Sequence, residues 1–313
     1  MYFFFILSGF LITYLLLHEK LQYKKINLRN FYLRRVLRIW PLYFLTIIVG
    51  FFVYPFLFND PVTGNFWLYS VFLTNFDHIW NGSVSSGILG VQWSVAIEEQ
   101  FYVIWPLLFI FIKNGKHLVY WFVAILLLSE IFFFTRNDWN ESYYHFFSCI
   151  RFLSFGGIMG YLGFYHENNI RHFFQLRINK VTTLFIYIIC PIILVTRGKI
   201  SELLNISISY FEPIILFFCA FVILEQCYSK NSIMKISKFV YLSKLGKISY
   251  GLYLTHMIGI YLAFDLCQYL EYESFIATVL FSLLFTFVIS HFSYYYFESY
   301  FLKLKSYFKP KSV

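Results

Sequence analysis

Residues 118–135 read LVYWFVAILLLSEIFFFT, an 18-residue run that carries one charged side chain, Glu130. A helix needs roughly 20 apolar residues to cross the hydrocarbon core of a bilayer, with about 17 as the lower limit. The run does not alternate apolar and polar residues with the period of two that a membrane barrel strand requires. It therefore predicts a membrane-spanning helix.

The same pattern recurs along the chain. An opening run from Phe3 to Leu17 is apolar but short, and the run 66–76 is too short to cross, so it is expected to form an interfacial or re-entrant helix. The sequence predicts an all-α, polytopic helical bundle with about nine spans in a single integral-membrane domain, 1–313. The other expected spans are 40–58, 94–112, 146–164, 181–195, 210–228, 248–266 and 275–297.

Composition supports a membrane protein. The chain of 313 residues is 59% hydrophobic and 13% charged, so a soluble fold would expose too much apolar surface. The five cysteines lie in or beside apolar runs and form no CxxC pair, which predicts buried apolar residues without a disulfide or a zinc site.

The basic residues indicate orientation. The net charge is +9, but 21 of the 25 Lys and Arg residues fall in alternate connections between the expected spans, and four of these lie in the C-terminal tail. Positive connections face the cytoplasm, so the tail is expected there and the charge does not indicate a nucleic-acid partner. In this orientation Met1 lies outside with two residues before the first run, and a preceding helix is expected.

Residues 31–41, FYLRRVLRIWP, place three arginines where a cytoplasmic loop enters a span. Arg35 and Arg38 are three residues apart and share a helix face, with Arg34 beside them. Guanidinium groups bind phosphate in a bidentate manner, which suits an anionic donor such as a nucleotide or coenzyme A. The alternative is an anchor on lipid headgroups.

Residues 91–102, VQWSVAIEEQFY, place two carboxylates near the outer end of a span. Glu98 and Tyr102 are one turn apart and should face the same way. An ionisable side chain at membrane depth is a functional candidate, while the alternative is pairing of the carboxylates with the helix dipole.

Three other spans carry polar residues. His256 lies eight residues into the span 248–266, where it serves either as a base or as a hydrogen-bond partner between helices. Glu130 and Arg151 each lie five residues from the outer ends of consecutive spans, and they predict a structural ion pair.

Together these stretches resemble the acyltransferase type 3 family of bacterial membrane O-acyltransferases, and the resemblance runs nearly end to end. Residues 4–12, FFILSGFLI, resemble the family's second-helix motif. The arginine run, the Trp93–Pro106 run and the Ile248–His256 run follow in the family's order. Residues 296–298, YFE, resemble its closing aromatic-acidic signature.

The resemblance implies a ten-helix domain in the bacterial inner (plasma) membrane. Such a domain moves an acyl group, commonly acetyl, from cytoplasmic acyl-CoA to a hydroxyl of an envelope carbohydrate or lipid-linked sugar, as in polysaccharide O-acetylation. Acyl-CoA is then a donor substrate, and no bound cofactor or metal is expected. The implied site residues are catalytic Glu98 and His256, donor-binding Arg34, Arg35 and Arg38, and supporting Trp93, Ser94 and Tyr102 on the acceptor side.

The sequence departs from the family at its start. The first-helix histidine held to be catalytic in the family has no counterpart here, so the chain is expected to be N-terminally truncated, and no soluble C-terminal domain is expected. Taking the arginines at the inner mouth and Glu98 near the outer one, the two would lie roughly 25 Å apart. Such a distance requires a relay or a deep cavity. The alternative functions are a multi-span transporter or flippase, and an inactive remnant of the enzyme.

Overall fold

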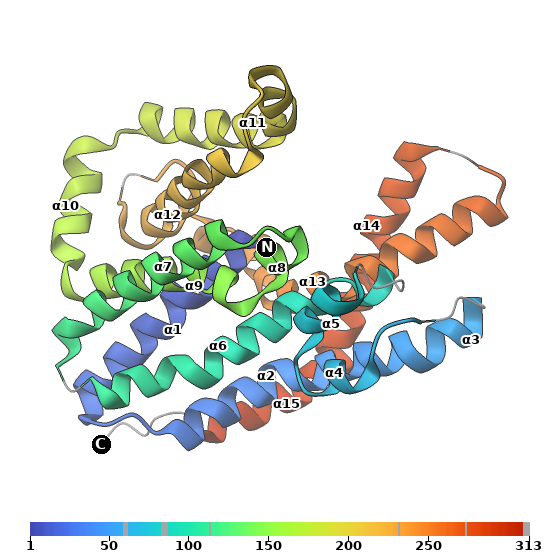
Figure 1. Cartoon of the computed structure of the whole chain (residues 1–313), viewed down its shortest axis with the longest axis horizontal. Helices are drawn as coiled ribbons and strands as arrows, with labels where there is room; N and C mark the ends of the chain where they lie inside the picture. The colour runs from blue at the N-terminus through green and yellow to red at the C-terminus, as the bar shows by residue number, and fades with distance from the viewer. Residues whose placement is uncertain (59–61, 83–86, 113, 231, 273, 309–313) are drawn as a thin grey trace. The chain divides into compact units, whose positions relative to one another are not determined.

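The structure is a computed structural model that describes residues 1–58, 62–82, 87–112, 114–230, 232–272 and 274–308. All regular structure in these ranges is helical, as Figure 1 shows, and the predicted all-α class is confirmed. The long helices are α1 (Tyr2–Tyr23), α2 (Leu28–Ile48), α6 (Gln92–Phe111), α7 (Leu118–Thr135), α9 (Phe146–Tyr165), α11 (Lys180–Leu204), α12 (Glu212–Tyr228), α13 (Val240–Tyr269) and α14 (Phe275–Phe292). The shorter ones are α3 (Tyr54–Phe58), α4 (Phe66–Ser70), α5 (Thr74–Asn81), α8 (Trp139–Tyr144), α10 (Glu167–Arg177) and α15 (Ser299–Leu304).

Eight helical segments of the described chain are long and apolar enough to cross a membrane. They include the short opening run, because α1 extends it to 22 residues, and they match every expected span except 248–266. That stretch lies in the 30-residue helix α13, whose tyrosines, His256 and Asp265 lower its hydropathy. The run 66–76 forms the short helices α4 and α5, consistent with a segment that does not cross.

Two of the long helices contain a π-helical turn. The turn Val49–Val53 carries α2 into α3, and the turn Ser293–Glu298 carries α14 into α15. A π turn accommodates an extra residue within an α-helix and occurs frequently at functional sites. The second of these turns shapes the candidate site described below.

Side-chain caps fix where several helices begin. The Asn27 side chain accepts a hydrogen bond from the Asn30 amide, and α2 therefore starts at Leu28. Asn179 and Ser274 cap α11 and α14 in the same way. Such side chains satisfy backbone amides that lack a partner in the first helical turn.

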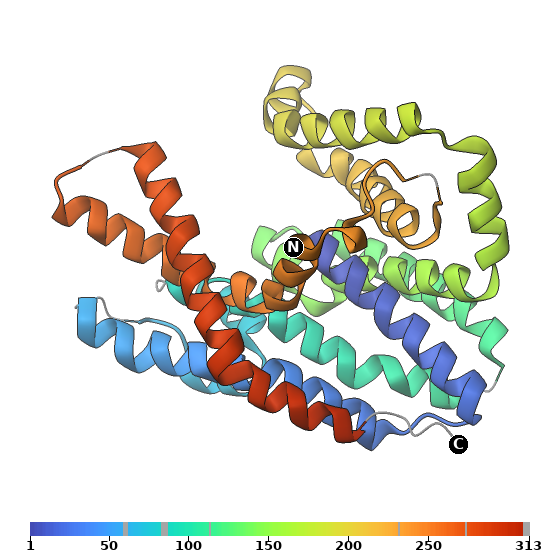
Figure 2. The same ribbon diagram turned by 180° about the vertical axis from the view of Figure 1, so that it is seen from behind.

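The chain divides into two compact units, which we describe separately. Unit 1 comprises 1–26, 108–132 and 149–240, and thus contains α1, α10, α11, α12 and most of α7 and α9. Unit 2 comprises 27–107, 133–148 and 241–313, and contains α2 to α5, most of α6, α8, most of α13, α14 and α15. Within unit 2, α15 runs alongside α2, as Figure 2 shows.

Unit 1 is held together by close contact between α1 and α9. A Cβ atom added at Gly9 would overlap the carbonyl oxygen of Leu153, and one at Gly156 would overlap the carbonyl oxygen of Ile6. Small residues allow membrane helices to approach until their backbones touch, which increases dispersion contacts in lipid. These glycines therefore set the separation of the two helices.

Unit 1 also buries a charge that is neutralised on two sides. The guanidinium of Arg151, on α9, donates to Glu130 on α7 at 3.2 Å and to Glu212 on α12 at 3.0 Å. The predicted Glu130–Arg151 pair is confirmed, and Glu212 completes a triad that joins three helices.

The cysteines follow the prediction at four of five positions. Cys149, Cys190, Cys219 and Cys267 are buried, but Cys227 is exposed near the end of α12. Its burial was predicted wrongly, because hydropathy does not show which face of a helix end meets solvent.

Candidate active site

The site is built on α2 and α6, which run antiparallel in unit 2. The Tyr32 hydroxyl donates to the carbonyl of Val103 at 3.0 Å. The Trp40 indole N–H donates to Glu99 at 3.2 Å. Residue numbers rise along one helix as they fall along the other, so the arginine turn of α2 lies level with the acidic turn of α6.

Arg35 lies between two aromatic rings at this level. Its guanidinium carbon is 5.5 Å from the ring centre of Phe31 and 5.4 Å from that of Tyr102. Attraction to the ring faces stabilises a cation that is partly removed from water. Its Nε is buried and has no hydrogen-bond partner among the described residues. Arg35 thus keeps hydrogen-bonding capacity that the surrounding helices do not use.

The other two arginines diverge from Arg35. Arg38 interacts electrostatically with Glu98 and with Glu298. Arg34 instead donates to the backbone carbonyl of Phe308 at 2.8 Å, which ties α2 to the end of the described chain. The three cations therefore do not form one clamp, and the site proper contains Arg35 and Arg38.

The adjacent carboxylates of Glu98 and Glu99 make different contacts near these arginines. Glu98 accepts a hydrogen bond from the Tyr102 hydroxyl at 3.0 Å, as expected from their spacing of one turn, and interacts electrostatically with Arg35. Glu99 is 8% exposed and uses one oxygen to accept from Trp40, while its other oxygen is buried without a hydrogen-bond partner in the described part of the chain. Both acids lie in the helical interior.

The expected separation of about 25 Å between the arginines and Glu98 is wrong. It assumed that α2 enters the membrane at residue 40 and leaves the arginines outside. The helix begins at Leu28 instead, so Arg35 lies seven residues inside it. Hydropathy underestimates the length of such a helix. Charged residues lower its average hydropathy even where they interact with other residues of the fold.

Helix α13 closes the site from a third direction. The Tyr250 hydroxyl donates to the carbonyl of Ile39 at 2.8 Å, which fixes α13 against α2. The Tyr253 and Ser94 hydroxyls are hydrogen-bonded at 2.5 Å, which fixes α13 against α6. Ser94 therefore lies at the junction of α6 and α13, one turn before Glu98.

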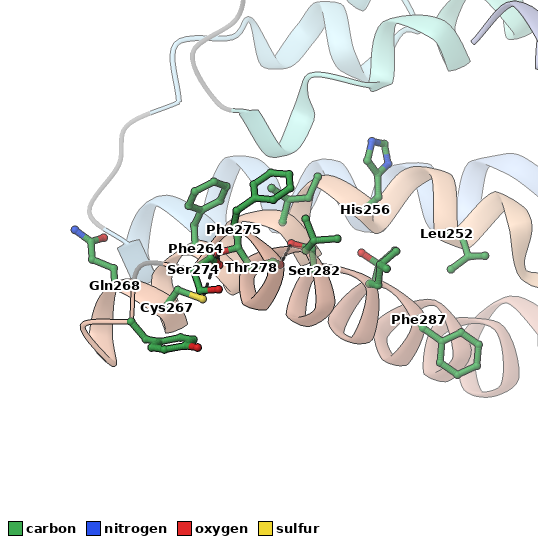
Figure 3. A pocket seen from close by; sticks show the side chains of 15 residues that line it. Leu252, His256, Phe264, Cys267, Gln268, Ser274, Phe275, Thr278, Ser282 and Phe287 are labelled. Carbon is green, nitrogen blue, oxygen red and sulfur yellow. Dashed lines mark hydrogen bonds between the residues drawn. The ribbon is translucent and has the colours of Figure 1, made fainter. Parts of the chain in front are cut away.

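His256 lies farther along α13. Its Nδ1 is 2.6 Å from the carbonyl oxygen of Tyr253, and an Nδ1–H that donates there leaves Nε2 as the basic nitrogen. The residue lines a groove of about 1170 Å³ between α13 and α14, shown in Figure 3 together with Leu252 and Phe287. No hydrogen bond or ion pair among the described residues joins His256 to Glu98, so the two predicted catalytic residues are not in direct contact.

Glu298 is a site residue that the sequence prediction missed. It is 6% exposed, accepts from the Ser293 hydroxyl at 3.1 Å, and lies close to Gly251 of α13. The π turn Ser293–Glu298 carries it. An acidic residue at the end of the last apolar run was the available signal, but only the fold shows that it faces Arg38.

Trp93 occupies the other end of the site, at the start of α6. It is 7% exposed, and its ring centre lies 4.8 Å from that of Tyr144 in an edge-on arrangement and 5.3 Å from that of Tyr143. In the part of the chain that the structure describes, no cluster of three metal-ligating side chains occurs.

This geometry brings two arginines and three glutamates together among the helices, and Glu99 and Glu298 are buried there. Buried ionisable groups in membrane helices are costly and are typical of functional sites. Positive groups there can bind an anionic substrate, and carboxylates can accept a proton from a hydroxyl. Fold and candidate site together describe a multi-pass membrane protein with a cluster of ionisable side chains among its helices.

Comparison with known sequences identifies its family. Residues 1–295 match the family model described as an acyltransferase domain, and the chain belongs to this family. This family assignment fits the multi-pass membrane architecture described above.

Individual relatives agree with this assignment. The chain is 32% identical over 146 residues to a peptidoglycan O-acetyltransferase of Listeria monocytogenes, an alignment that covers 41% of this chain and 23% of that protein. It is 25% identical over 276 residues to a Staphylococcus aureus protein with a provisional O-acetyltransferase name, covering 81% of this chain and 44% of that protein. The chain thus spans less than half the length of these relatives. No solved structure matches it.

Proposed function

We propose that this protein is a membrane O-acyltransferase that moves an acyl group, acetyl in the simplest case, from cytoplasmic acyl-CoA to a hydroxyl of an envelope carbohydrate or lipid-linked sugar. The observation that carries the proposal is the juxtaposition of Arg35 and Arg38 with Glu98 in unit 2. Family membership and the O-acetyltransferase names of two relatives support it.

The proposed roles follow from the chemistry of the side chains. Arg35 and Arg38 bind the anionic donor, and Glu98, oriented by Tyr102, accepts the proton of the acceptor hydroxyl. The hydroxyl oxygen attacks the thioester carbonyl carbon, the C–S bond breaks, and the proton finally resides on the coenzyme A thiol. His256 is a second candidate base, connected to Ser94 through Tyr253.

The proposal includes a location. We place the chain in the bacterial inner membrane as one multi-pass domain, 1–313, with its Lys-rich C-terminus in the cytoplasm. The positive-inside distribution of Lys and Arg supports this orientation. Cysteine accessibility labelling at Lys303 and at Lys116 tests it, because both positions are exposed and should react from the cytoplasmic side.

The enzyme activity is tested with membranes from cells that produce the chain. Acetyl-labelled acetyl-CoA is supplied, and label is followed into envelope carbohydrate. An Arg35→Ala variant should lower transfer by about a hundredfold, because Arg35 is the cation with the largest electrostatic effect on Glu98. Arg29→Ala is the matched control, since Arg29 lies on the same helix but is exposed.

Three results would contradict the proposal. Absence of covalent label in the carbohydrate would refute acyl transfer by this chain and favour an inactive form. Accumulation of unmodified substrate would favour the transporter or flippase alternative. Equal loss of transfer in the Arg35 and Arg29 variants would refute the role of the interior cation.

A further inference from the structure

Helix α5 of unit 2 is polar but buried. Thr74, Asn75 and Asp77 are fully buried there. The two oxygens of Asp77 accept hydrogen bonds from the Asn65 amide at 3.2 Å and from the Asn81 side chain at 2.7 Å. A short helix outside the candidate spans is thus held by its own polar side chains.

The same helix is fixed against its neighbours α6 and α8. The Asn75 side chain donates to the carbonyl of Tyr144 at 3.2 Å and accepts from Gln100 at 2.8 Å. Figure 1 shows α5 and α8 next to each other in unit 2. Because hydrogen bonds fix α5 on two sides, its side chains have defined positions.

His78 stands out within this rigid segment. It is 3% exposed, yet neither ring nitrogen has a hydrogen-bond partner among the described residues. Its ring stacks on Tyr144, with centres 4.7 Å apart and planes inclined by 18°. Burying a polar group without a partner is costly, so a group from outside the chain is expected to form the missing hydrogen bonds with the ring nitrogens. Burial also lowers the pKa of His78 to about 4, so the neutral ring can both donate and accept near neutral pH.

Tyr144 connects His78 to a set of aromatic rings, here called the aromatic platform: Trp93, Trp139, Tyr143 and Tyr144. Trp139 stacks on Tyr143 with ring centres 4.8 Å apart and planes inclined by only 10°. Trp139 is 64% exposed, whereas Trp93 is 7% exposed. The platform therefore has one exposed flat ring, that of Trp139, and a buried ring, that of Trp93.

The surroundings of the platform favour a neutral, hydroxyl-rich ligand. Asp138 and Glu141 flank Trp139 in sequence together with Asn140, while one cation, Arg136, pairs with Glu141 at 3.6 Å. Carboxylates and amides accept hydrogen bonds from sugar hydroxyls, and the C–H face of a pyranose packs on an aromatic ring. A surplus of acidic groups disfavours phosphate, and hence both lipid headgroups and coenzyme A.

We propose that His78 and the aromatic platform form a carbohydrate subsite that holds the acceptor sugar near Glu98. Trp93 belongs to the platform and lies five residues before Glu98 on α6, about 7.5 Å along the helix axis. A sugar on the platform is therefore held within about two helical turns of Glu98 along the α6 axis. The subsite supplies a binding place for the acceptor of the proposed reaction. Its identification as an acceptor site therefore rests on the proposed function.

Direct binding tests the subsite without requiring acyl transfer. The full chain in detergent is titrated calorimetrically with soluble tetrasaccharides of N-acetylglucosamine, glucose and galactose, in the absence of acyl-CoA. At least one should bind, and Trp139→Ala should weaken its binding about tenfold. Trp67→Ala is the matched control, because Trp67 is 74% exposed in the same unit but lies outside the platform.

A second variant separates ligand binding from folding. His78→Phe keeps a ring that can stack on Tyr144 but removes both nitrogens, so sugar affinity should fall about tenfold while the melting temperature stays equal or rises. In membranes with transfer activity, both variants should raise KM for the acceptor and leave KM for acetyl-CoA unchanged.

The outcomes distinguish this subsite from the proposed function. Sugar binding without acyl transfer would retain the subsite and refute the enzyme. Failure of all three sugars to bind, or unchanged affinity in both variants, would refute the subsite. If Trp139→Ala changed only the partitioning of the protein into vesicles of anionic lipid, Trp139 would be a membrane anchor and the subsite would again be refuted.

Discussion

The two units treat an arginine that lies among their helices in opposite ways. In unit 1, Arg151 is neutralised by Glu130 and Glu212 on two other helices. In unit 2, Arg35 lies between aromatic rings and forms no salt bridge with a carboxylate of the described residues. A charge that carboxylates of the fold neutralise serves stability, and a charge without a carboxylate partner is available to an anionic ligand. The comparison teaches that pairing with carboxylates separates the structural charge from the functional one.

Replacement of each arginine by methionine gives the largest expected effects. Arg151→Met leaves two carboxylates without their cation and should cost about 3 kcal/mol of stability, the lower end for a broken buried pair because Glu130 is 30% exposed. Arg35→Met should leave stability nearly unchanged and lower acyl transfer about a hundredfold. Thermal unfolding in detergent and the transfer assay measure both. Comparable destabilisation by the two variants would remove the distinction between the units.

The contact between α1 and α9 should be the next most sensitive feature. Gly9→Ala places a Cβ against the Leu153 carbonyl oxygen and forces the two backbones apart, at a cost of about 1–3 kcal/mol. Gly198→Ala is the control, because a Cβ at Gly198 meets no atom within 4 Å. The melting temperature should fall for Gly9→Ala alone. A fall of equal size in both would show that the contact between α1 and α9 is not the cause, since helix propensity by itself favours Ala over Gly.

The burial of His78 predicts that the stability of unit 2 depends on pH. Burial lowers its folded-state pKa to about 4, from an ordinary value of 6.5, with Asp77 opposing the change. The unfolded state therefore binds more protons between these values, and stability conferred by the neutral ring is lost as pH falls from about 6.5 towards 4. His78→Phe should make the melting temperature less sensitive to pH in this window. Identical pH profiles would contradict a buried neutral histidine.

The smallest effect is expected at the junction of α6 and α13. Tyr253→Phe removes the hydrogen bond to Ser94 and should cost about 1 kcal/mol. If that bond positions Glu98, kcat should fall several-fold while the acyl-CoA KM remains constant. Tyr241→Phe, at an exposed position of the same helix, provides the control. A stability loss with unchanged kcat would make Ser94 purely structural.

Much of this architecture follows from sequence, for physical reasons. Runs such as 118–135 must be helices in lipid, and the Glu130–Arg151 pair follows from equal depth in consecutive spans. Glu212 was missed because it lies 61 residues from Arg151, and no local pattern encodes which helices meet. For the same reason, the sequence did not predict that Glu298 belongs to the site or that Trp40 and Glu99 form a hydrogen bond.

The candidate site was predictable in its residue types but not in its arrangement. The spacing of Glu98 and Tyr102 correctly predicted their contact. The depth of Arg35 was misjudged, because an Asn cap starts α2 before the hydrophobic run begins. The burial of Thr74, Asn75 and Asp77 in α5 has no apolar signature, since polar side chains there are held by hydrogen bonds such as those of Asn75 to α6 and α8.

The wide turn Ser293–Glu298 determines the rotational phase of everything that follows it in the last helix. One residue corresponds to about 100° of rotation in an α-helix. Regular α-helical winding of the same residues would rotate the Glu298 carboxylate about a quarter of a turn from its present position, without altering any side chain at the site. The chemistry near Arg38 is thus sensitive to backbone winding as well as to residue identity.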